Sequence, residues 1–147
     1  YDFDLAVERI RAAAAARALA RDFVLVARAD GIMNGQYDID EAVRRLTAFD
    51  AAGADCLYAP IPKNPADIAR ICAATAKPVN AIAAGPYTHL SRAEFGALGV
   101  ARISLGSALA RATHSVIHDA AKAMFERGDF SPLAPRVPGS VIDALLA

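Results

Sequence analysis

Four short apolar segments alternate with longer helix-like segments, and this order constrains the fold more than any other feature of the sequence. The apolar segments are too short and too rich in β-branched residues to be helices. We therefore predict strands over 23–30, 55–60, 78–84 and 101–106. We predict helices over 5–20, 38–53, 64–77, 91–99 and 107–128. Strands that alternate with helices indicate a parallel sheet with helical crossovers, which is an α/β fold.

Two of the predicted helices begin with the spacing of a capping box. Asp38 is followed three residues later by Glu41, and Ser91 is followed three residues later by Glu94. At this spacing each side chain can accept a hydrogen bond from the other residue's amide in the first turn. We therefore expect both helices to have reciprocal caps.

The length of the chain leaves two architectures open. Four βα units make half of an eight-stranded barrel, and they also fit an open, flavodoxin-like sheet. A complete (β/α)8 barrel takes about 250 residues, whereas this chain has 147 and begins at Tyr1 without a methionine. We expect it to be the later part of a longer chain, with the βα units over 1–128 and a Pro-containing tail over 129–147 suited to contact between subunits.

The charge balance limits the partners. Lys+Arg and Asp+Glu each number 16, and no basic run occurs, which argues against a nucleic acid or an anionic membrane as partner. No apolar run approaches the roughly 18 residues that span a bilayer, and no signal peptide is visible. Cys56 and Cys72 lie in apolar surroundings outside any CxxC pattern, as reduced core cysteines do. We expect a cytoplasmic protein that binds a small molecule.

The segment FVLVARADG, residues 23–31, ends a strand with two charged residues. Arg28 and Asp30 lie two apart, so they share a face of the strand. They stand at its carboxyl end, where α/β folds hold their ligands. One interpretation is that they only pair with each other or reach solvent. The other is that Arg28 binds a carboxylate or phosphonate in a fork geometry, while Asp30 orients it or touches the water shell of a metal.

Further polar residues follow the other strands. Tyr58 is either a hydroxyl donor to a ligand or a core tyrosine. Asn80 lies in an otherwise apolar strand, and it either holds a neighbouring strand end or faces the ligand. Ser104 and Gly106 share a face with Arg102, and Gly106 opens a helix where an anion could approach free amides. A glycine between a strand and a helix is also commonly structural.

Four stretches of the sequence together resemble the isocitrate lyase / phosphoenolpyruvate mutase superfamily. They are FVLVARADG, AVRRLTAFDAAGADCLYAPIP, KPVNAI and LGVARISLGSALARA, in the family's order and spacing, from about residue 5 to 125. The pieces LYAP and RISLGSALARA resemble the bacterial subgroup labelled phosphoenolpyruvate phosphonomutase-like or carboxyphosphonoenolpyruvate phosphonomutase-like.

The resemblance implies a (β/α)8 TIM barrel whose fifth to eighth strands are the four found here. It implies that Arg28 holds the anionic group of a small 2-oxo or 2-hydroxy acid and that Asp30 matches the acidic position after it. It also implies Mg2+, with the metal-binding aspartates and the mobile catalytic loop in the first half of the barrel. We therefore expect no metal ligand in this chain and assign no catalytic acid or base.

Two positions depart from the lyase pattern, and they keep the reaction open. Lyases carry a glutamate at the end of strand six, where this chain has Pro60. They carry an asparagine where it has Ile82, with Asn80 two residues earlier. We predict a Mg2+-dependent enzyme that cleaves a C–C bond through an enolate-like intermediate. The alternatives are a phosphonomutase acting on a P–C bond and an inactive half-barrel that serves as a structural or interaction module. The resemblance further implies a homo-oligomer, a dimer or tetramer, that exchanges its last helix.

Overall fold

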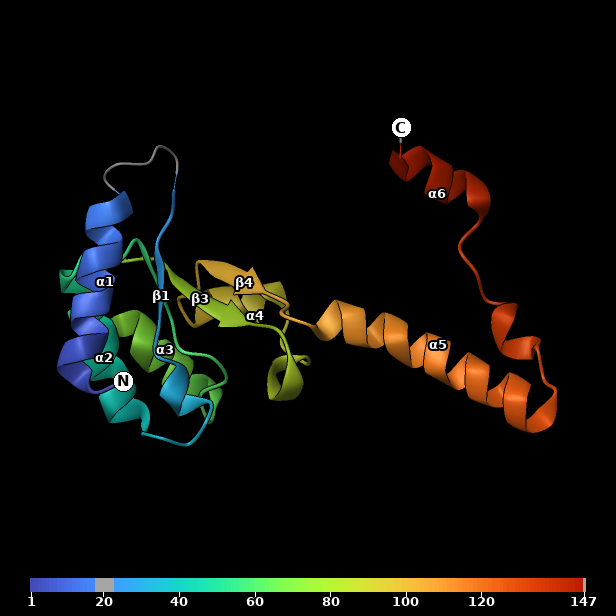
Figure 1. Cartoon of the computed structure of the whole chain (residues 1–147), viewed down its shortest axis with the longest axis horizontal. Helices are drawn as coiled ribbons and strands as arrows, with labels where there is room; N and C mark the ends of the chain where they lie inside the picture. The colour runs from blue at the N-terminus through green and yellow to red at the C-terminus, as the bar shows by residue number, and fades with distance from the viewer. Residues whose placement is uncertain (18–22, 147) are drawn as a thin grey trace. The chain divides into compact units, whose positions relative to one another are not determined.

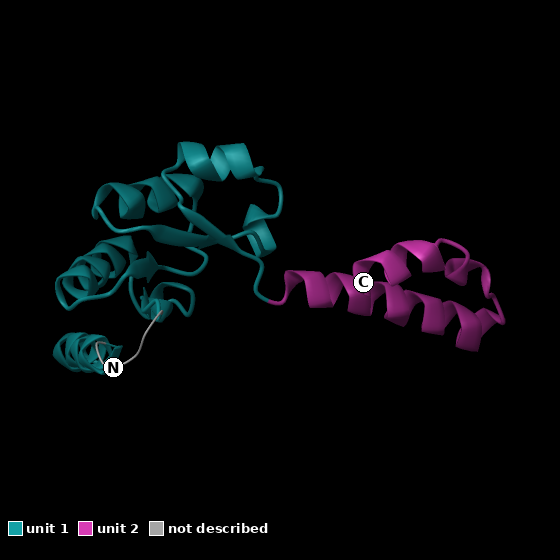
Figure 2. Ribbon diagram, turned by 90° about the horizontal axis from the view of Figure 1, so that it is seen from above, with its two compact units in different colours: residues 1–106 teal, residues 107–147 magenta. Residues whose placement is uncertain are grey.

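The computed structural model describes residues 1–17 and 23–146. It forms two compact units, residues 1–106 and residues 107–147 (Figure 2). We call the first the sheet unit and the second the helical unit. The predicted domain boundary between residues 128 and 129 falls inside the helical unit, and the role of the tail stays a prediction.

The sheet unit contains four strands that alternate with four helices, beginning with a helix (Figure 1). Its strands are β1 (Val26–Arg28), β2 (Cys56–Tyr58), β3 (Val79–Ile82) and β4 (Arg102–Ser104). Its helices are α1 (Phe3–Arg17), α2 (Ile39–Ala51), α3 (Pro65–Ala73) and α4 (Arg92–Ala97), with short 3-10 turns η1 (Asp30–Ile32) and η2 (Gly85–Tyr87). The helical unit contains α5 (Ala108–Arg127), η3 (Ser131–Leu133) and α6 (Gly139–Leu146).

The sheet confirms the predicted parallel α/β arrangement. Its strand order is β1-β2-β3-β4, and every neighbouring pair is parallel. The strands are shorter than predicted, at three or four residues each, because a segment is a strand only where its neighbours pair with it. Phe23 and Val24, predicted in the first strand, lie before it and are 58% and 64% exposed. Residues 18–20, predicted at the end of the first helix, lie outside the described residues.

One face of the sheet packs against the helices (Figure 2). Leu57 of β2 is fully buried and packs in one cluster with residues of α2 and α3. Burial of a leucine side chain of this size stabilises the folded state by about 2 kcal/mol. Phe95 of α4, 1% exposed, anchors a second cluster that includes Ala81 of β3. Because strand side chains alternate, the neighbours of Leu57 and Ala81 in the chain point to the opposite face.

The helix caps are partly as predicted. The box at the start of α4 is complete, since each of its two side chains accepts a hydrogen bond from the other residue's amide. At the start of α2, Asp38 Oδ1 accepts from the Glu41 amide at 3.0 Å. The Glu41 carboxylate does not return the bond, because it accepts from Arg44 Nε and Arg45 Nε, each at 2.7 Å. The reciprocal half of this predicted box is therefore wrong.

The helical unit ends its long helix at Gly128, as predicted, in a left-handed conformation with φ 65°. Helix α6, in the predicted tail, was not expected from the sequence. Many large apolar side chains of this unit are exposed, among them Val116, Ile117, Phe125, Leu145 and Leu146. In the part of the chain that is described, no helix has the length and apolar character needed to cross a membrane.

Candidate functional site

Four polar side chains lie at one level across the sheet. Arg28 pairs in register with Tyr58, Tyr58 with Asn80, and Asn80 with Arg102. Register partners in a parallel sheet point to the same side, and this side is opposite to the helix-packed face. We call these four residues the cross-strand row.

Arg28 is fixed by an acidic and an aromatic neighbour. Its Nη2 and Nε lie 2.8 and 3.0 Å from Asp30 Oδ1. Its Cζ stands 4.9 Å from the centroid of the Tyr58 ring, within the range of a cation–π contact. About half of each charged side chain is exposed, 48% for Arg28 and 50% for Asp30. The pair is compatible with both interpretations of the sequence, and substrate contact by Arg28 and Asp30 stays a prediction.

Tyr58 is buried, with 6% of its surface exposed. Burial raises the pKa of its phenol, while the charge of Arg28 and the hydroxyl of Ser104 act in the opposite direction. Because burial is the largest of these effects, the phenol keeps its proton at neutral pH. Tyr58 can therefore donate a hydrogen bond to an anionic oxygen.

Asn80 connects two residues of β4. Its side chain is buried, at 2% exposed. Its Oδ1 accepts from Arg102 Nη1 at 2.8 Å, and its Nδ2 donates to Ser104 Oγ at 3.1 Å. Ser104 Oγ in turn donates to the carbonyl of Ala81 at 3.2 Å. These contacts hold the neighbouring strand, which was one of the two predicted roles; direct contact of Asn80 or Ser104 with a ligand stays a prediction.

Gly106 has a backbone reason to be glycine. Its φ of 55° lies in the left-handed region, and a Cβ there would stand 2.9 Å from Ile82 Cδ1. A side chain at this position would therefore meet both strain and a close contact. Anion binding by Gly106 stays a prediction.

Arg102 is the member of the row that was not selected from the sequence as a site residue. The sequence alone indicates only that Arg102 shares a face of its strand with Ser104 and Gly106. What places it against Asn80 is the register between β3 and β4. Arg102 could have been identified from the sequence by aligning the four apolar segments so that their polar residues match.

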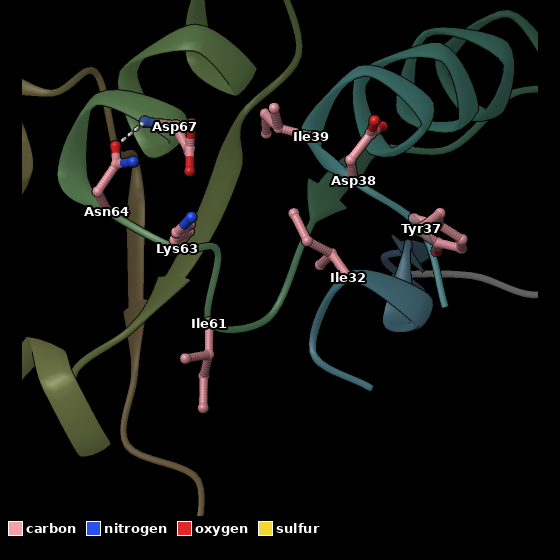
Figure 3. Close-up of a pocket in the computed structure, with 8 residues that line it drawn as sticks. All are labelled: Ile32, Tyr37, Asp38, Ile39, Ile61, Lys63, Asn64 and Asp67. Atoms are coloured by element: carbon pink, nitrogen blue, oxygen red, sulfur yellow. Dashed lines mark hydrogen bonds between the residues drawn. The ribbon is translucent and has the colours of Figure 1, made fainter. Parts of the chain in front are cut away.

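The sheet unit has two hollows near the ends of β1 and β2. A cavity of about 140 Å3 adjoins the Arg28–Asp30 pair and is also lined by Tyr37 and Arg45. A larger hollow of about 500 Å3 lies between the start of α2 and the loop after β2 (Figure 3). It contains none of the six predicted site residues; its lining residues are Ile32, Tyr37, Asp38, Ile39, Ile61, Lys63, Asn64 and Asp67.

The loop after β2 contains a strained residue. Ile61 has a φ of 47°, which is unfavourable for a β-branched side chain. It is one of the residues that line the larger hollow (Figure 3). This segment follows Pro60, the position where the resemblance implies a glutamate in lyases.

The described residues do not by themselves fit a magnesium site. Within residues 1–17 and 23–146, no three His, Cys, Asp or Glu side chains gather closely enough to hold a metal ion. Asp30, the acidic residue of the candidate site, is engaged by Arg28. A Mg2+ requirement therefore depends on ligands outside these residues.

Comparison with known proteins identifies the family. A Burkholderia cenocepacia J2315 protein described as a candidate lyase/mutase is 42% identical, with a TM-score of 0.91 over 100% of this chain and 53% of that one. An oxaloacetate acetylhydrolase solved with its product oxalate is 25% identical, with a TM-score of 0.78 over 99% of this chain and 50% of that one. An uncharacterized Mycobacterium tuberculosis protein is 34% identical over 70 residues, 48% of this chain and 26% of that protein.

The chain thus spans about half the length of the solved structures and about a quarter of the curated relative. Its four βα units match TIM-barrel relatives over about half of their chains, which confirms the predicted barrel type. The family model for phosphoenolpyruvate phosphomutase matches residues 1–125. The chain therefore belongs to the phosphoenolpyruvate phosphomutase family, within the isocitrate lyase / phosphoenolpyruvate mutase superfamily.

Proposed function

We propose that the protein containing this chain is a lyase or mutase that acts on a small anionic carboxylic acid. The first candidate reaction is cleavage of a C–C bond in a 2-oxo or 2-hydroxy acid through an enolate-like intermediate. The observation that carries this proposal is the Arg28 guanidinium, held between Asp30 and the Tyr58 ring at the end of β1. The similarity to oxaloacetate acetylhydrolase supports a small carboxylate substrate.

The residues of this chain would bind and orient the substrate. Asp30 occupies Nε and one side of Nη2 of Arg28, which leaves the other donors of the guanidinium for a carboxylate. The protonated phenol of Tyr58 can donate to an oxygen of the same anion. Mg2+, if the protein uses it, would stabilise the developing negative charge of the enolate. Its ligands would come from outside the described residues.

A phosphonomutase acting on a P–C bond is the second candidate. The matched family model describes a phosphoenolpyruvate phosphomutase. Pro60 supports this candidate, because it replaces the glutamate that the resemblance implies for lyases at the end of strand six. The same arginine could bind a phosphonate in place of a carboxylate.

Substitution of Arg28 tests the proposed site. The natural protein is incubated with Mg2+ and a panel of 2-hydroxy and 2-oxo dicarboxylates, and the carboxylic acid fragments that are released are identified and measured. Conversion of phosphoenolpyruvate is followed in parallel by 31P NMR. We expect Arg28→Lys to lower kcat/KM by tenfold or more, because lysine lacks the planar fork. The matched control is Arg92→Lys at an exposed site on α4.

The outcomes separate the candidate functions. Unchanged kinetics in Arg28→Lys would contradict the role of Arg28. No turnover of any substrate by the natural protein would favour the third alternative, an inactive structural or interaction module. The product distinguishes the two enzyme reactions, since only C–C cleavage splits the carbon chain of the substrate into two fragments.

We further propose that the helical unit mediates assembly into a homo-oligomer, a dimer or tetramer. Phe125 and Leu146 are 90% and 84% exposed, so neither is covered within its own unit. Exposed apolar side chains at this density mark a surface that another surface covers. Light scattering of the natural protein after gel filtration tests this, and a monomer mass at all concentrations would contradict it.

A further inference from the structure

Two guanidinium groups approach the middle of the sheet from its two outer strands. Arg28, on β1, leans over the Tyr58 ring at 4.9 Å. Arg102, on β4, reaches Asn80 with its Nη1 at 2.8 Å from Oδ1. Tyr58 and Asn80 are register partners on adjacent strands, and adjacent strands lie about 4.8 Å apart. The two cations therefore converge, although their own strands are separated by two others.

The two cations differ in how their charge is balanced. The Arg28 guanidinium lies against the Asp30 carboxylate. Arg102 forms no salt bridge with any carboxylate among residues 1–17 and 23–146, and its partner Asn80 is neutral. The uncompensated positive charge of the cross-strand row thus belongs to Arg102.

The charge of Arg102 acts on the same side of the sheet as Arg28. It opposes the rise that burial causes in the pKa of Tyr58 and of Cys56. Both residues point to the face that carries the row, because Cys56 and Tyr58 lie two apart on β2. Arg102 therefore lies on the same side of the sheet as Tyr58.

Asn80 fixes the direction of Arg102. Its buried carboxamide accepts from Arg102 on one side and donates to Ser104 on the other. Ser104 is tied to the backbone carbonyl of Ala81. A chain of hydrogen bonds thus runs from the β3 backbone to the guanidinium, and its neutral link keeps the charge of Arg102 available.

We propose that Arg102 binds a second anionic group of the substrate and so selects dianions over monoanions, with Asn80 as its positioning residue. This inference rests on the proposed function, in which Arg28 binds the first anionic group. A substrate of this kind carries its two charged groups a few bonds apart, so that each guanidinium engages one of them. Asn80 acts through Arg102 and does not itself touch the substrate.

A matched pair of probes tests this inference. Succinate and butyrate share a four-carbon chain and differ by one carboxylate. Their affinities for the natural full-length protein are measured by isothermal titration calorimetry, and the fold of each variant is checked by circular dichroism. We expect Arg102→Gln to weaken succinate binding by about tenfold or more, the loss typical of a hydrogen bond to a charged group. Butyrate binding should change less than about twofold.

Two further variants separate the roles of the residues. Arg28→Gln should weaken both probes, since it removes the site for the first carboxylate. Asn80→Asp keeps an acceptor for Arg102 but places a negative charge against it. We therefore expect Asn80→Asp to lose the preference for succinate while the protein stays folded, which a purely structural role of Asn80 would not produce.

The outcomes distinguish this inference from the proposed function. If Arg102→Gln binds succinate as the natural protein does while Arg28→Gln loses both probes, the inference is wrong and the proposed anion site stands. If no variant changes either affinity, the proposed site is wrong as well. A natural protein that binds succinate no more tightly than butyrate also overturns the inference. A preference for succinate that persists in Asn80→Asp overturns the positioning role of Asn80.

Discussion

Gly31 stands where the structure leaves no room for a side chain, and Gly31→Ala should destabilise the protein. The residue is buried in η1, directly after Asp30. A Cβ on Gly31 would lie 2.6 Å from Cδ1 and Cζ of Tyr37, and closer still to Cε1. Ordinary contact is about 3.5–4.0 Å, so the ring has to move by about 1 Å or more.

The magnitude follows from two losses. Displacing a packed ring costs about 1–3 kcal/mol. The movement also takes the Tyr37 hydroxyl away from the Gly31 amide, which it accepts from at 2.9 Å, at a further cost of about 0.5–1.5 kcal/mol. We therefore expect Gly31→Ala to lower the free energy of unfolding by about 1.5–4.5 kcal/mol.

Urea unfolding of the natural protein, followed by far-UV circular dichroism, measures this loss. The control is Gly96→Ala, because Gly96 lies in α4 with no atom within 4 Å of its Cβ position. In a helix this change should be neutral or stabilise by up to about 1 kcal/mol. In a Tyr37→Ala background Gly31→Ala should cost less than about 1 kcal/mol, because the obstructing ring is gone. A loss below about 0.5 kcal/mol in the otherwise natural protein would refute the argument.

Two further predictions concern titratable groups. The hydrogen bond from Arg44 is the largest cause that lowers the pKa of Glu41 below its usual 4.5, so Arg44→Gln should raise that pKa in an NMR titration. A carboxyl group whose pKa is lower in the folded state than in the unfolded state stabilises the folded state at pH values above the unfolded-state pKa, and this effect is lost as the pH falls through the folded-state pKa. The difference in stability between the natural protein and Arg44→Gln should therefore be largest near neutral pH and shrink in acid. An unchanged pKa of Glu41 in Arg44→Gln would contradict the role of Arg44. Burial raises the pKa of the Cys56 and Cys72 thiols. Near neutral pH, iodoacetamide should therefore label both cysteines far more slowly in the folded protein than in urea. Fast labelling of either cysteine in the folded protein would contradict this expectation.

The order of the elements could be predicted from the sequence because it depends on local signals. Apolar runs such as the one before Arg28, and caps such as Asp38 and Ser91, act within a few residues. The ends of the strands could not be predicted in the same way. Phe23 and Val24 have strand-like side chains but lie outside β1, because pairing with the neighbouring strand decides where the strand begins.

The candidate site shows the same division between local and distant information. Arg28 and Asp30 lie two residues apart, and their pairing was among the sequence-based alternatives. The contact between Asn80 and Arg102 joins residues 22 positions apart and depends on the register of β3 and β4. The incomplete capping box of α2 could not be predicted for a similar reason. The Glu41 carboxylate has several possible partners within reach, and the capping-box pattern includes only one of them.

The in-register alignment of the cross-strand row has a consequence for how the sequence can vary. Its four members come from four separate repeats, joined by helices and loops that add nothing to the alignment itself. Lengthening or shortening a connecting loop leaves every member in place. Losing one residue inside a strand turns the following side chains to the other face, so that a group such as Tyr58 would exchange places with Leu57. Divergent relatives should therefore differ in length between the strands while keeping each strand's residue count constant.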